Sequence, residues 1–300
     1  MGQNHGQEYI AYSPIGRERK EYNLQCTLSK ITVDYETIGA GKPIVMLHGY
    51  GVDRHLMKGC MEPIFQTQPG WRRIYLDLPG MGRTPGAEWI KNSDQMLEIV
   101  IEFIATVLPK ENLVVAGESY GGYLARGLVK HQADRLDGVL LICPCIIAPR
   151  AQRRLPKFEV LEADPTLIAG LTVAEREEFV PMAVVQNATT WKRFQMEIMP
   201  GVALADEPFL THLQRNGYAF SFDPDRLEQP FSKPVLLLTG RQDASVGYQD
   251  ALTVIENYSR GTFVVLDKAG HNLQIEQAGL FEALVKEWLE RVEKEEVRRM

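Results

Sequence analysis

Cysteine is scarce in this chain, and it has neither an excess of positive charge nor long apolar runs. It has four cysteines in 300 residues, and their positions show neither the spacing of a disulfide scaffold nor that of a zinc site. We therefore expect buried or partly buried thiols and no metal ion. The formal net charge is −6, which argues against nucleic acid as a partner, because nucleic acid requires a basic stripe or patch.

The chain also lacks segments that would attach it to a membrane. No stretch approaches the roughly eighteen consecutive apolar residues of a membrane-spanning helix. The segment Met1 to Gly6 is polar and provides no apolar core for a signal peptide. We therefore expect a cytoplasmic protein. With 45% hydrophobic residues it can bury a large core, as one elaborated domain or as a domain with a sizeable insertion.

The most informative motif that is present runs from Gly117 to Gly121 and reads Gly-Glu-Ser-Tyr-Gly. It follows the apolar run Leu113 to Ala116 and opens a helical stretch, so Ser119 falls on a strand-to-helix turn. This context is typical of a nucleophile elbow, in which glycines flank the serine because larger side chains would collide. The alternative is a Gly/Ser turn without chemistry, but the flanking strand and helix favour a nucleophile.

A serine hydroxyl needs a base within hydrogen-bond reach, and the base needs an orienting partner. Three histidines follow Ser119 in the chain, namely His131, His212 and His271. The first two fit helical positions. His271 lies in a loop directly after the strand-like segment Thr262 to Leu266, where a base can overhang the edge of a sheet. The sequence therefore predicts His271 as the base.

The partner of this histidine is predicted to be Asp243. It follows the apolar strand Val235 to Thr239 through a short turn, and its carboxylate could fix the tautomer of the imidazole. Asp is also common in turns for purely structural reasons. Asp250 and Asp267 compete for the role, but the first is expected in the next helix and the second at the end of its own strand.

Together with two further segments, these motifs resemble the serine-type α/β-hydrolase superfamily, in its lid-bearing branch. Ile44 to Gly51 resembles the family's strand followed by His-Gly, and Asp77 to Gly82 resembles the loop after its fourth strand. Gly240 to Asp243 and the pair Gly270-His271 resemble its acid and base loops. Five motifs occur in the family's order from the first quarter of the chain to its end, so the resemblance is specific for the fold.

The resemblance also implies roles for individual residues. Ser119 would be the nucleophile, His271 the general base and acid, and Asp243 its orienting partner. The backbone N–H groups of Tyr50 and Tyr120 would form the oxyanion hole. Neither a metal nor an organic cofactor is needed for this chemistry.

Strand and helix signals alternate along most of the chain, which predicts a mostly parallel sheet with helices on both faces. We expect an α/β-hydrolase fold with eight strands. The expected strands are Tyr22 to Leu28, Ile31 to Ile38, Ile44 to His48, Arg73 to Leu78, Leu113 to Gly117, Gly138 to Cys143, Val235 to Thr239 and Thr262 to Leu266. Helices are expected over Ser93 to Leu108 and Gln277 to Val297. Residues 21–145 and 230–300 would form the core. Residues 1–20 would form a polar arm, either ordered or loose, and its polar character favours a loose one.

The alternation stops between Ile146 and Gln229, which marks an insertion after the sixth strand. No clear strand signal appears there, and the resemblance implies that residues 146–229 form a helical lid. Thr172 to Glu175 has the form of a capping box, and further helices are expected over Asn187 to Met199 and Pro208 to Asn216. The residues expected to contact the substrate are His48, Gly49, Trp191, Phe194 and Met196. Aromatic residues in a lid predict a small-molecule substrate with an apolar acyl or alcohol moiety.

Arg150, Arg153 and Arg154 cluster where this insertion leaves the sheet. Such a cluster is commonly a solvated face. The alternative is recognition of an anionic group on the substrate, and the sequence leaves both interpretations open.

The function predicted from these observations is hydrolysis of a small-molecule carboxylic ester or lactone through an acyl-enzyme on Ser119, as in a carboxylesterase. Serine at the elbow disfavours the dehalogenases and epoxide hydrolases of the superfamily, which attack with an aspartate. Asn272 stands where carbon–carbon hydrolases of ring-cleavage pathways carry tryptophan. Amide or carbon–carbon bond hydrolysis, or a ligand receptor that retains a slow triad, remain the alternatives.

Overall fold

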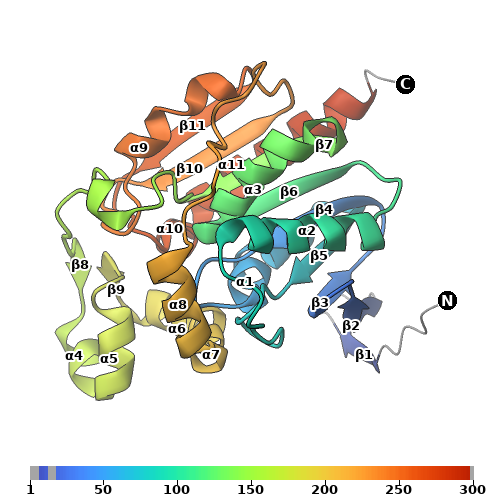
Figure 1. Cartoon of the computed structure of the whole chain (residues 1–300). Coiled ribbons are helices and arrows are strands. Elements are labelled where there is room, and N and C mark those ends of the chain that lie inside the picture. Colours follow the sequence, from blue (N-terminus) through green and yellow to red (C-terminus); the bar gives the residue numbers. More distant parts are fainter. Residues whose placement is uncertain (1–6, 13–17, 298–300) are drawn as a thin grey trace.

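The computed structural model describes residues 7–12 and 18–297, and the side chains of residues 23–295. Its main sheet has nine strands in the order β1-β2-β3-β5-β4-β6-β7-β10-β11 (Figure 1). The strands are β1 Gln7–Tyr12, β2 Glu18–Thr27, β3 Thr32–Ile38, β4 Lys42–Leu47, β5 Trp71–Leu76, β6 Leu113–Glu118, β7 Leu136–Ile142, β10 Val235–Gly240 and β11 Gly261–Leu266. The first three are antiparallel to their neighbours, and the other six are parallel.

Helices cover both faces of this sheet, as the alternating pattern predicted. Helices α2, Ser93–Val107, and α3, Tyr120–Gln132, pack together on one face, and α1, Arg54–Phe65, and α11, Ala278–Val297, on the other (Figure 1). Every residue of β6 and β10 is consequently buried. Parallel strands that are covered on both faces are expected to be continuously apolar, which is why these segments stood out in the sequence.

The region between β7 and β10 is an insertion built mainly of short helices, and it lies over the end of the sheet where α1 begins (Figure 1). Its elements are β8 Glu162–Ala163, α4 Pro165–Gly170, α5 Val173–Phe179, β9 Val185–Gln186, α6 Ala188–Glu197, α7 Met199–Leu204 and α8 Glu207–Asn216. The capping box predicted at Thr172 is present, with Glu175 as its second member. The insertion also contains the parallel pair β8 and β9, for which no clear strand signal was found in the sequence. Two-residue strands are too short to show an apolar alternation.

Short helices complete the described chain around the loops of the sheet. These are α9 Gln249–Leu252, α10 Leu273–Glu276 and the 3₁₀ segments Ala133–Arg135, Arg150–Gln152 and Ile255–Asn257. All four cysteines are free and buried, as predicted. Within the described residues, no helix combines the length and the hydropathy required to span a bilayer.

The loose arm predicted for residues 1–20 is corrected in its described part. Gln7–Tyr12 form β1, which pairs antiparallel with β2, and β2 itself begins at Glu18. Strand pairing satisfies backbone N–H and C=O groups whatever the side chains are, so a polar composition did not reveal it. Residues 1–6 and 13–17 of the predicted arm lie outside the described residues. The eight predicted strands correspond to β2 through β7, β10 and β11, and β1 is the ninth.

Candidate active site

Ser119 lies on a strained turn between β6 and α3. Its backbone has φ 50° and ψ −110°, a conformation that L-residues rarely adopt. A Cβ on Gly117 would lie 2.3 Å from the carbonyl oxygen of Gly121, and a Cβ on Gly121 would lie 2.1 Å from that of Leu47. Both glycines are therefore required by the close approach of the backbone, as the sequence analysis predicted.

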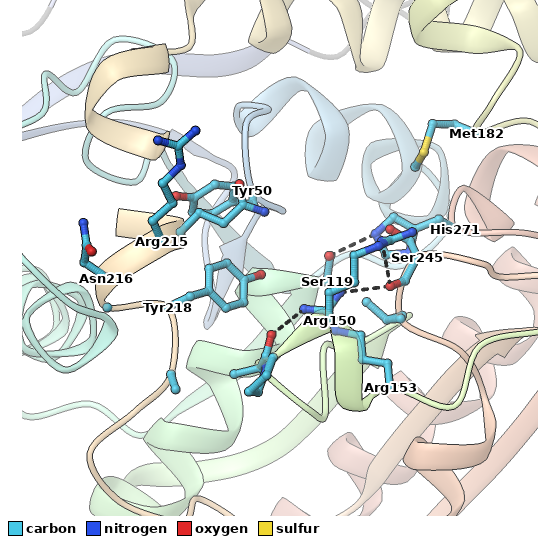
Figure 2. Close-up of a pocket in the computed structure, with 16 residues that line it drawn as sticks. Tyr50, Ser119, Arg150, Arg153, Met182, Arg215, Asn216, Tyr218, Ser245 and His271 are labelled. Atoms are coloured by element: carbon cyan, nitrogen blue, oxygen red, sulfur yellow. Dashed lines mark hydrogen bonds between the residues drawn. The ribbon is translucent and has the colours of Figure 1, made fainter. Parts of the chain in front are cut away.

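The structure brings together the three residues predicted to carry the chemistry. Oγ of Ser119 lies 2.9 Å from Nε2 of His271 (Figure 2). Nδ1 of His271 lies 2.9 Å from Oδ2 of Asp243. An ionised carboxylate only accepts hydrogen bonds, so Nδ1 carries the proton and Nε2 is free to accept from the serine hydroxyl. The three side chains follow β6, β11 and β10 and meet at the carboxyl edge of the parallel strands.

Asp243 is held in place by the backbone that follows it. Its Oδ1 accepts hydrogen bonds from the N–H groups of Ser245 at 2.8 Å and Val246 at 3.0 Å. The side chain is completely buried. Burial by itself would raise the pKa of Asp243, but attraction to His271 and these hydrogen bonds outweigh it and lower the pKa.

The two competing acids lie elsewhere, as the sequence analysis expected. Asp250 is buried at the start of α9 and is paired with Arg154, whereas Asp267 is exposed at the end of β11 and accepts from Gln242.

A second buried carboxyl group, which the sequence analysis missed, lies beside the histidine. Oε1 of Glu118 is 3.4 Å from Nε2 of His271, and Glu118 is only 2% exposed. Burial raises the pKa of Glu118 to about 7, with attraction to His271 lowering it and repulsion from Asp243 raising it. Its position directly before the nucleophile, at the end of a buried strand, was the signal available in the sequence.

Opposing effects act on the pKa of His271. Burial lowers its pKa, but the charge and hydrogen bond of Asp243, together with the charge of Glu118, raise it to about 9. The two carboxyl groups on either side of the ring thus stabilise the imidazolium, and Nε2 can accept from the serine hydroxyl only while the ring is neutral.

Tyr50, in the loop after β4, and Tyr120, at the start of α3, are in contact with each other. Their rings meet edge to face with centroids 5.2 Å apart. The hydroxyl of Tyr50 donates to the carbonyl oxygen of Leu210 in α8, whereas Tyr120 is buried with its hydroxyl 2.8 Å from Oγ of Ser93. In the described part of the chain, the backbone N–H of neither tyrosine donates to a protein acceptor.

Two cavities open on Ser119, and both are lined by Tyr50, Ser119, Met182 and His271. The larger, of about 540 Å³, also reaches Arg150, Arg153, Arg215, Asn216, Tyr218 and Ser245, and we call it the arginine cavity (Figure 2). The smaller, of about 280 Å³, is also lined by Gly49, Val52, Leu56, Glu118, Phe194, Ile198 and Val202, and we call it the apolar cavity. The nucleophile thus lies between a polar and a mainly apolar space.

The predicted substrate contacts divide into two groups. Gly49 and Phe194 line the apolar cavity. Trp191 does not line either cavity and packs behind Phe194, with the rings 6.1 Å apart. Met196 was predicted to contact the substrate as well, but its side chain is 63% exposed and lines neither cavity.

His48 was also predicted to contact the substrate, and the structure places it elsewhere. It is completely buried under its loop, where Nε2 accepts from the N–H of Leu78 at 3.0 Å and Nδ1 lies 2.7 Å from the carbonyl oxygen of Gly49. Burial lowers the pKa of His48. The neutral ring therefore joins two backbone loops, and it lines neither cavity.

One set of side chains in the described residues combines metal-ligand types at short range. It consists of Cys143, Asp243 and His271. Burial, the charges of Asp243 and Glu118 and a hydrogen bond that the thiol donates to Asp243 keep the pKa of Cys143 well above its usual value, so the thiol is protonated. Asp243 and His271 already bind each other, and a protonated thiol is a poor metal ligand.

The order of these side chains along the sheet edge, with a serine after β6, an acid after β10 and a histidine after β11, is that of the α/β hydrolases. A model of the alpha/beta hydrolase family matches residues 44–284, and the chain belongs to this family.

Individual relatives extend over most of the chain. An alpha/beta superfamily hydrolase from Oenococcus oeni has a crystal structure that covers 90% of this chain and 99% of its own, with a TM-score of 0.81 and 32% identity. A pimeloyl-(acyl-carrier protein) methyl ester esterase of Aeromonas salmonicida is 28% identical over 80% of this chain and 92% of its own length. A 2-hydroxy-6-oxononadienedioate/2-hydroxy-6-oxononatrienedioate hydrolase of Paraburkholderia phymatum is 24% identical over 87% of this chain and 92% of its own.

Proposed function

We propose that this protein is a serine hydrolase that cleaves a small-molecule carboxylic ester or lactone through an acyl-enzyme on Ser119. The observation that carries the proposal is the continuous hydrogen-bonded chain from Ser119 through His271 to Asp243, at the junction of two cavities. The resemblance to an esterase over four-fifths of the chain favours an ester among the possible acyl substrates.

In the proposed reaction, Oγ of Ser119 attacks the ester carbonyl while Nε2 of His271 takes the hydroxyl proton. Asp243 holds the ring and stabilises the imidazolium that forms. The histidine then gives this proton to the departing alcohol. A water molecule, deprotonated by the same nitrogen, attacks the acyl-enzyme and releases the carboxylic acid.

The oxyanion of the tetrahedral intermediate would be held by the backbone N–H groups of Tyr50 and Tyr120. Both are without a protein acceptor in the described chain, which supports the assignment. Tyr120 is the first residue of α3, where N–H groups are unpaired and the helix dipole favours negative charge. Loss of one such donor typically lowers kcat by about a hundredfold to a thousandfold.

The apolar part of the substrate would occupy the apolar cavity. Phe194 from α6 and Val202 from α7 form part of its wall, opposite Leu56 of α1. In this proposal residues 146–229 act as a lid, because α6 and α7 roof the nucleophile while packing on α1. Neither a metal nor an organic cofactor has a role in these steps.

A second candidate substrate class is supported by the Paraburkholderia relative, whose name describes a hydrolase of a hydroxy-oxo-dienedioate. Asn272, which stands where the ring-cleavage hydrolases were expected to carry tryptophan, disfavours it. Comparing turnover of such a dienedioate with that of simple esters separates the two candidates.

The proposal is tested with a panel of p-nitrophenyl esters, the wild-type protein and Ser119→Ala. We expect turnover by the wild type, its loss in the variant, and a single fluorophosphonate adduct on Ser119 by intact-mass analysis. Equal rates in the two proteins, or no adduct, would remove the acyl-enzyme mechanism and favour a ligand receptor of the same fold.

A further inference from the structure

The arginine cavity and the apolar cavity meet at Ser119 but differ in charge. Three arginines line the arginine cavity, and none of the described residues that line it carries a carboxylate. The apolar cavity is lined by apolar side chains and by Glu118, Glu178 and Glu207. The formal net charge of the chain is −6, so the cationic wall is a local arrangement and not a consequence of composition.

The guanidinium of Arg153 is fixed in this wall without being neutralised. Its Nε donates to the carbonyl oxygen of Ile147 at 2.7 Å, its Nη1 to that of Ser245 at 2.9 Å and its Nη2 to that of Ala148 at 2.9 Å. Its Nη2 also donates to Sγ of Cys145 at 3.3 Å, and all four acceptors are neutral. The group is half-buried, so its charge is screened less than that of an exposed arginine.

Arg150 repeats this pattern on the same wall. It is exposed, and its Nη2 donates to the carbonyl oxygen of Ala244 at 3.2 Å. The third member of the sequence cluster behaves differently, because Arg154 forms an ion pair with Asp250 at 2.6 Å and does not line the cavity. The two arginines that face the nucleophile are thus the ones held by carbonyl groups.

Arg215, near the end of α8, lies across the cavity from Arg150 and Arg153, next to Asn216 (Figure 2). A group bound in the arginine cavity is therefore exposed to positive charge from two sides. Guanidinium N–H groups that the protein leaves free can donate to carboxylate and phosphate oxygens, and such charge-assisted hydrogen bonds are about twice as strong as neutral ones.

We propose, on the basis of the proposed hydrolase function, that the substrate is an ester carrying an anionic group, a carboxylate or a phosphate, that binds Arg150 and Arg153. The apolar part of the same molecule lies on the other side of the scissile bond, in the apolar cavity. Of the two interpretations that the sequence left open for this arginine cluster, the geometry thus favours an anion-binding role for two members and a structural ion pair for Arg154.

The test compares two methyl esters of equal chain length, methyl hexanoate and monomethyl adipate, which differ in a terminal methyl or carboxylate. We expect the wild type to have the higher kcat/KM for the adipate ester. In Arg150→Gln/Arg153→Gln the ratio of the two kcat/KM values should fall by about tenfold or more, since hydrogen bonds to charged groups contribute that much. The methyl ester of ω-phosphonohexanoic acid distinguishes a phosphate-type anion from a carboxylate.

Arg83→Gln is the matched control for each single substitution, because Arg83 is exposed and lines neither cavity, and its replacement likewise removes one positive charge. Arg150→Gln alone covers the case in which the loss of Arg153 impairs folding. An equal kcat/KM for the two methyl esters in wild type, or a ratio unchanged in the double variant, would overturn the anion site while leaving the hydrolase proposal intact.

If neither ester is hydrolysed, that result counts against the proposed hydrolase function. The anion site can still be tested in that case, by measuring binding. Calorimetric titration of Ser119→Ala with both esters should show tighter binding of monomethyl adipate. Adding Arg150→Gln should remove this preference, and higher ionic strength should weaken it. Equal affinities for the two esters would contradict the proposal.

Discussion

Glu118 and Ser119 approach the same nitrogen of His271 from neighbouring positions in the chain. Nε2 lies 2.9 Å from the serine hydroxyl and 3.4 Å from a carboxyl oxygen of Glu118. The carboxyl group also lines the apolar cavity. The protonation of the proposed base thus depends on a titratable group that the reaction scheme does not consume.

We predict that Glu118→Gln shifts the pH dependence of hydrolysis to lower pH. The reaction requires neutral His271, so kcat/KM should rise with pH through the pKa of His271, which is raised to about 9. Glu118 has a pKa of about 7, so above that pH its negative charge stabilises the imidazolium. Removal of this charge lowers the pKa of His271 and moves the rising limb to lower pH. A pH profile of kcat/KM with a p-nitrophenyl ester measures the shift.

The control is Glu178→Gln, which removes an exposed carboxylate from the lining of the same cavity. Water screens this charge, so the rising limb of the pH profile of kcat/KM should stay close to its wild-type position. If kcat/KM of Glu118→Gln and of the wild type rises at the same pH, the proposed coupling between the carboxyl group and His271 does not operate.

Asp243→Asn should lower kcat by about ten thousandfold with little change in the fold. The N–H groups of Ser245 and Val246 will hold the amide oxygen, because they already hold Oδ1 of the carboxylate. The amide NH₂ then faces Nδ1 of His271 and donates to it. This places the ring proton on Nε2, where it faces Ser119, and the histidine can no longer accept the serine proton.

Steady-state kinetics of Asp243→Asn against Asp267→Asn checks this prediction. Asp267 is exposed and bonded to Gln242, so its variant should retain wild-type activity. Activity of Asp243→Asn within about tenfold of wild type would show that the tautomer is fixed by another group.

The sequence predicted the parts of the site that depend on local structure. Ser119, Asp243 and His271 each follow a parallel strand within a few residues, so the apolar runs placed all three at one edge of the sheet. Helical periodicity distinguishes Phe194 from Met196. Residues two apart point to nearly opposite sides of a helix. Only Phe194 faces the cavity. That distinction was available from the sequence.

Other features depend on contacts between distant segments and could not be predicted in this way. The pKa of Glu118 is set by burial among loops that carry Gly49, Asp243 and His271. His48 follows a strand like the catalytic candidates, yet its ring turns inward to accept from Leu78, thirty positions further along the chain. Strand β1 joins the sheet through backbone hydrogen bonds, which leave no pattern in side-chain polarity.

Arg54→Met should destabilise the protein strongly. The guanidinium is 5% exposed and pairs with Asp34 and with Asp77, at 2.8 Å for the latter. Its removal leaves two buried carboxylates without a counter-charge, which typically costs about 3–5 kcal/mol. Arg72→Met is the matched control, because Arg72 and Glu111 form a more exposed pair, at 30% and 46%, whose loss costs about 0–1 kcal/mol. Urea unfolding at neutral pH measures the free energy of unfolding of both variants. Equal losses of stability would contradict a role for burial.

Tyr50→Phe should lower kcat more than it changes KM. The hydroxyl of Tyr50 donates to the carbonyl oxygen of Leu210, and this bond ties the loop after β4 to α8. Without it the loop loses about 1 kcal/mol of stabilisation, and the backbone N–H of the same residue is less well aimed at the oxyanion. The bond thus connects the insertion to the proposed oxyanion hole.

Michaelis–Menten kinetics with a neutral ester, measured beside thermal unfolding, separates this effect from simple destabilisation. Tyr218→Phe is the control, because Tyr218 lines the arginine cavity with Tyr50 but is not proposed to supply an oxyanion donor. A lower unfolding temperature of Tyr50→Phe with an unchanged kcat would assign the hydroxyl a structural role alone. A fall in kcat specific to Tyr50→Phe would indicate that contact with α8 fixes the position of the oxyanion donor.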